Sequence, residues 1–193
     1  FPTAAGAFNN RDGIGNAHYP EHYLARLEAD NLQSEDDFLN AVRSTRSVIL
    51  YPSADKQLKT CDINVEFWKD SSSRAAGSSA GSYRNGVCTS GEVSVEMTDI
   101  GLIATFPAGA DYTFTVSGAD AGKLAMSIYA YDDMELDPAR TMDFNSLPST
   151  NGSPCTVYVP EDPYDEFYAE DANGKEYVPD SDSEYPDRVD SPA

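Results

Sequence analysis

The chain has 193 residues, of which 33 are acidic and 13 basic, so its formal net charge at pH 7 is −20. Nucleic-acid binding needs a basic surface, so this charge excludes nucleic acid as a partner, and it argues against binding to anionic membranes. Hydrophobic residues make up 40% of the chain, enough for the core of one domain, and no run approaches the ~20 apolar residues of a membrane span.

The chain begins at Phe1 rather than at a methionine, which predicts a mature protein that has lost a secretory leader or a pro-segment. We therefore expect a secreted, extracellular or surface-associated protein. Residues 1–17 are rich in glycine, alanine and asparagine and show little periodicity, so they are predicted to form an extended arm.

Residues 18–47 are predicted to be helical, as two short helices or one bent helix. Pro20 suits the first turn of a helix. The stretch "SEDDFLNAVRS" then starts a second helical pattern, with Ser34 and Asp37 at the spacing of a capping box and an apolar stripe after them.

From Val48 the pattern changes to short apolar or alternating runs separated by turn residues. Their spacing of roughly 8–14 residues is typical of an antiparallel sandwich, and no crossover helices separate them as parallel strands would require. We predict a mainly β fold, an Ig-like antiparallel β-sandwich over residues 48–160. The runs are "SVILY", "CDINVEFW", "GEVSVEMTDI", "GLIATFP", "DYTFTVSG", "GKLAMSIYAY", "RTMDFNSL" and "CTVYVP".

The polar stretch "KDSSSRAAGSSAGSYRNG" between Trp68 and Val87 is predicted to be a long hairpin loop. Cys61 and Cys88 flank it, which makes them the natural disulfide pair of an exported chain. Cys155 is then left over, and an odd thiol suggests a bridge to another molecule. The alternative is three buried free thiols.

Residues 161–193 form an acidic tail rich in tyrosine and proline. From Pro160 onward twelve acidic residues stand against two basic ones, so the segment alone would be disordered. Its aromatic residues are predicted to anchor it, extended, on the sandwich or on a neighbouring subunit. The anchors of the two arms are Phe1, Phe8, Tyr164, Phe167, Tyr168, Tyr177 and Tyr185.

Two motifs resemble catalytic signatures. "HYPEH" reads H-x-x-E-H, the inverted zinc-peptidase motif, with His18 and His22 as ligands and Glu21 as base, but Pro20 interrupts the helix that the motif needs. "GSSAG" matches G-x-S-x-G around Ser79, but it lies in a polar loop and no histidine follows it. We therefore assign no catalytic residue.

Carboxylates crowd one loop between strands, one tight turn and one alternating run near the end of the chain. Calcium takes roughly six to eight oxygen ligands, which such clusters supply, although none has the spacing of an EF-hand loop. We predict calcium at one or more clusters, with a solvated acidic surface as the alternative. The residues are Asp132, Asp133, Glu135 and Asp137 in the loop, Asp171, Asn173 and Gly174 in the turn, and Asp180, Asp182 and Glu184 in the run.

The stretches "FPAGADYTFTVSGADAGKLAMSIYAYDD", "LPSTNGSPCTVYV" and "DANGKEYVPD" carry one resemblance. Together they resemble the accessory β-sandwich modules of secreted bacterial proteins, which sit behind hydrolase or adhesion domains. The resemblance covers about residues 61–180 and implies a non-catalytic extracellular module.

These observations favour a non-catalytic, secreted structural subunit of an extracellular or surface assembly, such as a filament, a shell or an appendage. Its arms would hold neighbouring copies in a homo-oligomer or polymer. The alternative is an accessory attachment domain released from a larger secreted hydrolase, and a remote alternative is a small zinc peptidase.

Overall fold

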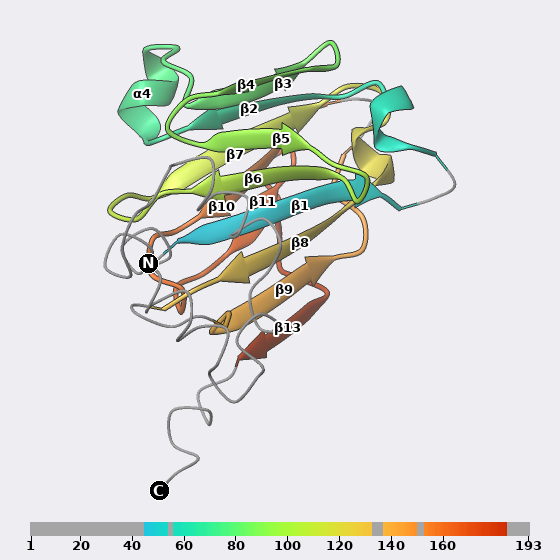
Figure 1. The fold of residues 1–193 in the computed structure, drawn as a ribbon. Helices are drawn as coiled ribbons and strands as arrows, with labels where there is room; N and C mark the ends of the chain where they lie inside the picture. The colour runs from blue at the N-terminus through green and yellow to red at the C-terminus, as the bar shows by residue number, and fades with distance from the viewer. Residues whose placement is uncertain (1–44, 54–55, 133–136, 150–152, 185–193) are drawn as a thin grey trace, which may run out of the picture.

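A computed structural model of the chain describes residues 45–53, 56–132, 137–149 and 153–184. Two antiparallel sheets of six and seven strands pack face to face (Figure 1), which confirms the predicted mainly β sandwich. The predicted arm 1–17 and the helical segment up to residue 44 lie outside the described residues. Arg46 and Ser47, predicted to be helical, already belong to the first strand.

The six-stranded sheet has the order β13-β9-β8-β1-β6-β5. Its central strand β1 pairs antiparallel with β8 on one side and β6 on the other. The strands are β1 (Arg46–Pro52), β5 (Ser94–Met97), β6 (Leu102–Phe106), β8 (Leu124–Ala130), β9 (Arg140–Phe144) and β13 (Ser181–Glu184).

The seven-stranded sheet has the order β12-β11-β10-β7-β2-β3-β4. Its strands are β2 (Asn64–Trp68), β3 (Gly81–Arg84), β4 (Val87–Ser90), β7 (Tyr112–Ser117), β10 (Cys155–Val159), β11 (Tyr168–Glu170) and β12 (Glu176–Tyr177). One short helix, α4 (Ser71–Ala75), and two 3₁₀ turns, η2 (Leu58–Thr60) and η3 (Ala121–Lys123), complete the elements of the described residues.

Alternating sequence places the core between the sheets. In β7 every second side chain is buried and the others are threonine or serine, so one face of the strand packs inward and the other meets solvent. Phe67, Phe106 and Phe114 meet in the interior, with ring centroids 5.1–6.2 Å apart. Their contact joins strands of both sheets.

The predicted hairpin loop before Val87 is wrong in part. Gly81, Ser82 and Tyr83 are buried in β3, which pairs with β2 and β4. A Cβ atom on Gly81 would lie 3.0 Å from the carbonyl oxygen of Val93, so the absence of a side chain lets this strand pack closely. The strand escaped prediction because two of its three buried positions are glycine and serine, which give no hydrophobic signal.

The acidic tail belongs to the sandwich as far as Glu184. β11 and β12 extend the seven-stranded sheet beyond β10. β13 then pairs with β9 at the edge of the other sheet, as Figure 1 shows. One continuous segment therefore forms an edge of each sheet. These edge strands are short and carry acidic side chains, which discourages pairing with another chain.

The aromatic residues predicted to anchor the tail differ in their surroundings. Phe167 is 1% exposed, and the Arg140 guanidinium lies 5.4 Å from its ring centroid. Tyr168 stacks on Tyr158, whereas Tyr164 is 44% exposed. The predicted anchors Phe1, Phe8 and Tyr185 lie outside the described residues.

The predicted disulfide between Cys61 and Cys88 is wrong, because all three cysteines are free thiols. Cys61 lies just before β2, and β3 separates β2 from β4, which carries Cys88. Two strand spacings amount to about 9.6 Å, whereas the Cα atoms of bridged cysteines lie about 4.4–6.8 Å apart.

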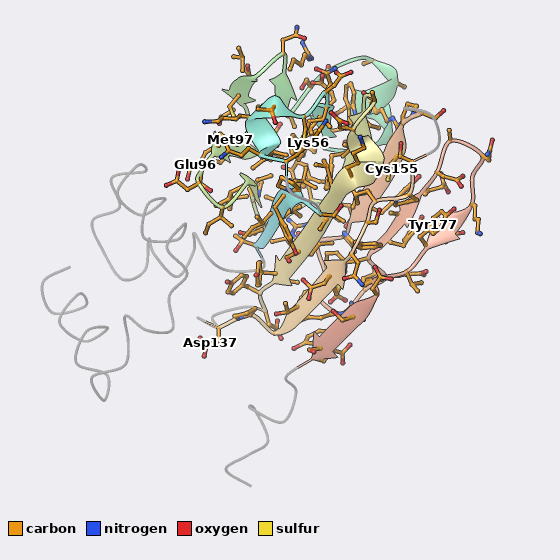
Figure 2. The ribbon with its side chains drawn as sticks, turned by 90° about the vertical axis from the view of Figure 1, so that its right-hand side faces the viewer. Lys56, Glu96, Met97, Asp137, Cys155 and Tyr177 are labelled. Carbon is orange, nitrogen blue, oxygen red and sulfur yellow. The ribbon has the colours of Figure 1, made fainter. Side chains whose placement is uncertain are left out.

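The third thiol does not fit the predicted bridge to another molecule. Cys155 (Figure 2) is fully buried, and burial raises its pKa to about 12. A buried thiol that stays protonated is neither accessible nor nucleophilic. Cys155 therefore acts as a small core residue.

Within the described ranges, none of the helices has the length and apolar character needed to cross a membrane.

Candidate functional site: an aromatic groove on the seven-stranded sheet

An aromatic row crosses the solvent-facing side of the seven-stranded sheet. Trp68, Thr113, Tyr158 and Tyr168 pair in direct register across β2, β7, β10 and β11. Residues paired in this way point to the same face of a sheet. All four side chains are half-buried, and their neighbours along each strand point into the core. The row brings residues 100 positions apart in sequence into one line.

A groove of about 520 Å³ opens beside this row. Its lining residues are Thr113 and Tyr158 of the sheet and Ser71, Arg74 and Ala75 of α4. This volume is in the range of small-molecule sites. We call these five residues the Tyr158 groove.

Tyr158 is held in place by its neighbours. Its ring stacks on Tyr168 with centroids 4.4 Å apart and planes at 21°, and its hydroxyl donates a hydrogen bond of 3.3 Å to Glu170. Burial, with the nearby charge of Glu170, raises the pKa of Tyr158, so the phenol stays protonated at neutral pH. One ring face is thus occupied by Tyr168, and the ring also borders the groove.

Helix α4 contributes three of the five residues that line the groove. Asp70 caps α4 by accepting a hydrogen bond of 2.6 Å from the backbone N–H of Ser73, and no residue of α4 is buried. Gly77 follows with φ of +75°, a conformation that favours glycine. Little apolar burial therefore holds this helix in position.

Trp68 begins the connection that leads into α4. Its indole Nε1 is buried and, among the described residues, has no hydrogen-bond partner. An unpaired buried donor costs about 1–3 kcal/mol, so such groups are uncommon and require a reason. Trp68, which carries this donor, lies in the same cross-strand row as Thr113 and Tyr158 of the Tyr158 groove.

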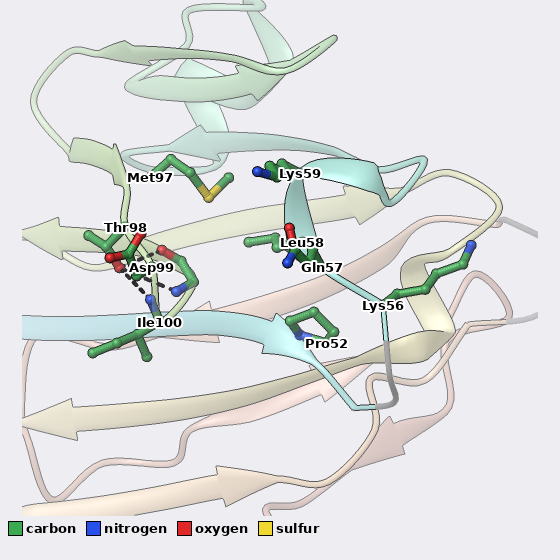
Figure 3. A pocket seen from close by; sticks show the side chains of 10 residues that line it. Pro52, Lys56, Gln57, Leu58, Lys59, Met97, Thr98, Asp99 and Ile100 are labelled. Atoms are coloured by element: carbon green, nitrogen blue, oxygen red, sulfur yellow. Dashed lines mark hydrogen bonds between the residues drawn. The ribbon is translucent and has the colours of Figure 1, made fainter.

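A second pocket of about 570 Å³ lies at one end of the sandwich, between η2 and the β5–β6 turn (Figure 3). Met97 and Leu58 contribute apolar surface, and Lys59 and Asp99 contribute opposite charges. The hydroxyl of Thr98 donates to the carbonyl of Gly101 at 2.9 Å, so the turn itself uses this group. The residues that line this pocket include no histidine, cysteine or serine, and they form no nucleophile–base pair.

Beside this pocket, Asp120 joins three segments. It accepts a hydrogen bond of 2.8 Å from the backbone N–H of Asp62 and forms ion pairs with Lys56 at 3.2 Å and Lys123 at 3.1 Å. The backbone hydrogen bond and the two ammonium groups lower the pKa of Asp120 to about 2. The carboxylate therefore fixes the loops that border the pocket.

We expect Asp120→Asn to reduce stability at neutral pH and to matter less in acid. The folded-state pKa is depressed, so the stabilisation is fully present above the ordinary carboxyl pKa and is lost as pH falls from about 4 to about 2. Urea unfolding of both proteins between pH 7 and pH 2 measures the difference. A gap that stays constant down to pH 2 would contradict this role.

Neither catalytic motif gains support from the structure. His18, Glu21 and His22 lie outside the described residues. The Ser79 hydroxyl donates to the Glu66 carboxylate and to the carbonyl of Gly81. Glu66 is in turn paired with Arg84 at 2.5 Å, so these contacts tie the start of β3 to β2.

Those carboxylates predicted to bind calcium that the structure describes do not gather into a site of three or more ligands. In the portion of the chain that the structure describes, no group of three or more histidine, cysteine or acidic side chains forms a metal site. Asp171 accepts bonds from the N–H groups of Asn173 and Lys175 and from the Tyr177 hydroxyl (Tyr177 is labelled in Figure 2), and these bonds lower its pKa. Calcium binding stays a prediction.

The other predicted ligands have protein partners of their own or lie outside the described residues. Asp132 accepts from the Tyr164 hydroxyl at 3.2 Å, and Asp180 accepts from the N–H of Asn145 at 2.7 Å. Asp182 and Glu184 both pair with Arg140. Asp137 is described, whereas Asp133 and Glu135 are not.

Sequence reasoning did not single out Trp68, Arg74 or Tyr158. In "CTVYVP" the alternation of Val157 and Val159 with Tyr158 was a sufficient signal that this tyrosine points outward. The position of Tyr158 in line with Trp68 depends on strand order and register, which the sequence pattern does not specify. Scans of the chain against protein-family models, curated proteins and solved structures find no match.

Proposed function

We propose that the chain is a non-catalytic attachment module of a secreted or surface protein, and that it binds a polymer of its surroundings through the Tyr158 groove. The observation that carries this proposal is the stacked tyrosine pair beside an open groove, in line with Trp68. Aromatic rings provide large apolar contact area at small cost in conformational entropy, and they dominate many binding surfaces.

The chemistry of the groove supports binding rather than catalysis. Its lining residues are one tyrosine, one threonine, one serine, one arginine and one alanine. They hold no pair of carboxylates and no base positioned against the serine or threonine hydroxyl. The resemblance to accessory modules of secreted proteins agrees with this function.

The assembly-subunit hypothesis depends on arms that reach a neighbouring molecule. As far as Glu184, the acidic tail forms strands in the chain's own two sheets, so these residues are already used. The N-terminal arm, residues 1–17, and the end of the tail, residues 185–193, lie outside the described residues. Light scattering on the 20.9 kDa chain separates the two functions, since we expect a monomer for the attachment module.

A pull-down assay tests the attachment function. The purified chain is mixed with insoluble cellulose, chitin, starch granules, peptidoglycan or collagen, and the bound fraction is measured. We expect retention by at least one polymer, and about 30-fold weaker retention for Tyr158→Ala, the effect of losing an interface residue worth about 2 kcal/mol.

The matched control is Tyr129→Ala, which removes a half-buried tyrosine from the six-stranded sheet instead. This variant should bind like the unaltered chain. If none of the polymers retains the unaltered chain, the attachment function is wrong.

A further inference from the structure

We propose that the polymer is a neutral polysaccharide, one sugar ring of which lies against Tyr158 in the groove, while α4 shifts so that the Trp68 N–H donates a hydrogen bond to a sugar oxygen. This inference rests on the proposed attachment function. The inference adds to that function the class of ligand, the groups that donate hydrogen bonds to it and the helix that moves.

The groove matches the two kinds of surface that a sugar ring presents. A pyranose ring has an apolar face of C–H groups and a rim of hydroxyl groups. The Tyr158 ring supplies an apolar wall. Around it lie the side chains of Ser71, Arg74 and Thr113, for which the described part of the chain supplies no hydrogen-bond partner. Donors and acceptors without partners beside an aromatic wall are what a polyhydroxylated ring requires.

The charge around the groove selects among ligands that stack on aromatic rings. Nucleic acids and acidic polysaccharides would meet a chain of net charge −20. Close to the groove, Glu170 lies at the Tyr158 hydroxyl, and burial together with the charges of Glu176 and Glu170 raises the pKa of Tyr168. Arg74 is the single basic residue of the groove lining, so an anionic polymer finds one attractive charge among several repulsive ones. A neutral ligand avoids this repulsion.

The position of Trp68 explains why α4 should move. Trp68 pairs with Thr113, which lines the groove, and its indole N–H is buried without a partner in the described structure. The chain runs from Trp68 through Lys69 and Asp70 directly into α4. A helix of five residues with none buried is displaced at little cost, and its displacement would bring the donor to the ligand.

The chain carries its own reporter for this movement, because Trp68 is its one tryptophan. Soluble neutral oligosaccharides, namely cellohexaose, chitohexaose and maltohexaose, are titrated into the protein while the emission of Trp68 is followed. Hexagalacturonate serves as the acidic comparison. The emission of the unaltered chain, Tyr158→Ala, Arg74→Ala and the control Tyr129→Ala is compared, whereas Trp68→Phe, which has no tryptophan, is measured by isothermal calorimetry. Thermal unfolding confirms that each variant is folded. Arg74 is exposed, so its replacement leaves the fold intact.

We expect at least one neutral oligosaccharide to change the emission of Trp68 in a saturable manner. Isothermal calorimetry should show binding about 30-fold weaker for Tyr158→Ala and about fivefold weaker for Trp68→Phe, which keeps the aromatic ring but loses the N–H donor. Arg74→Ala should weaken binding, and Tyr129→Ala should not.

Three results would overturn the inference while the attachment function survives. These are oligosaccharide binding that leaves the emission of Trp68 unchanged, binding by Tyr158→Ala equal to that of the unaltered chain, and a preference for the acidic oligosaccharide or for collagen. Failure of the unaltered chain to bind any polymer in the pull-down assay would instead contradict the attachment function itself.

Discussion

Replacing Phe167 by alanine should lower the free energy of unfolding by about 3–5 kcal/mol, the usual cost of removing a buried phenylalanine. The side chain is 1% exposed, so its loss removes apolar burial and leaves a cavity beneath Arg140. Urea unfolding at pH 7, followed by circular dichroism, measures the change. We expect a single transition at a lower urea concentration.

Tyr164→Ala is the control, because Tyr164 lies three residues earlier in the tail and is 44% exposed. It should cost less than about 1 kcal/mol, as substitutions at exposed positions usually do. Equal small effects for both variants would show that the tail is a detachable appendage. A large effect for Phe167→Ala alone would show that the acidic tail unfolds together with the sandwich.

The difference between a buried Phe167 and an exposed Tyr164 could be predicted from the sequence only in part. Its composition indicates a segment that would not fold by itself, and its aromatic residues indicate anchors. Composition does not show which aromatic ring is buried. Phe167 has no hydroxyl to keep wet and immediately precedes β11, whereas Tyr164 lies in the turn before it. Burial depends on the β10–β11 pairing, a contact that sequence pattern alone does not specify.

The strands of the sandwich were predictable where large apolar residues alternate with polar ones. "DYTFTVS" and "CDINVEFW" became β7 and β2 because Phe114, Val116, Val65 and Phe67 repeat with a period of two. β3 was missed because glycine and serine provide two of its three buried positions. Small residues fit where another strand approaches closely, but they give no hydrophobic signal.

The candidate site was less predictable than the fold, because it depends on strand order and register. Trp68 and Tyr158 lie 90 positions apart, and they share a row because β7 separates β2 from β10 and pairs in register with both. The predicted disulfide was wrong because residues that flank one stretch of sequence need not be close in space. Cys61 and Cys88 flank one segment of sequence, but β3 occupies the space between their strands. Proximity in sequence therefore gave the wrong pairing, because strand order determines which residues are close.

Replacing Arg140 by alanine should lower the free energy of unfolding by about 2–4 kcal/mol. Arg140 is 8% exposed and donates two hydrogen bonds to Asp182, of 2.9 and 2.8 Å, from β9 to β13. It also donates to the carbonyls of Asp165 at 2.5 Å and Pro163 at 3.3 Å. One side chain thus ties both the segment before β11 and the edge strand β13 to the sandwich.

The matched control is Arg84→Ala, which breaks the ion pair with Glu66 on a side chain that is 59% exposed. Exposed ion pairs contribute about 1 kcal/mol or less, so this variant should unfold close to the unaltered chain. A double-mutant cycle with Asp182→Asn isolates the coupling between Arg140 and Asp182. Equal losses in Arg140→Ala and Arg84→Ala would contradict a special role for Arg140.

The same pair makes the attachment of the tail dependent on pH. The hydrogen bonds from Arg140 lower the pKa of Asp182, so the stabilisation is present above the ordinary carboxyl pKa and is lost as pH falls through the depressed value. The stability gap between the unaltered chain and Arg140→Ala should therefore narrow in acid. β11 follows the segment that Arg140 holds, and its Tyr168 stacks on Tyr158 of the groove. Loosening the tail in acid should therefore also weaken ligand binding at the groove.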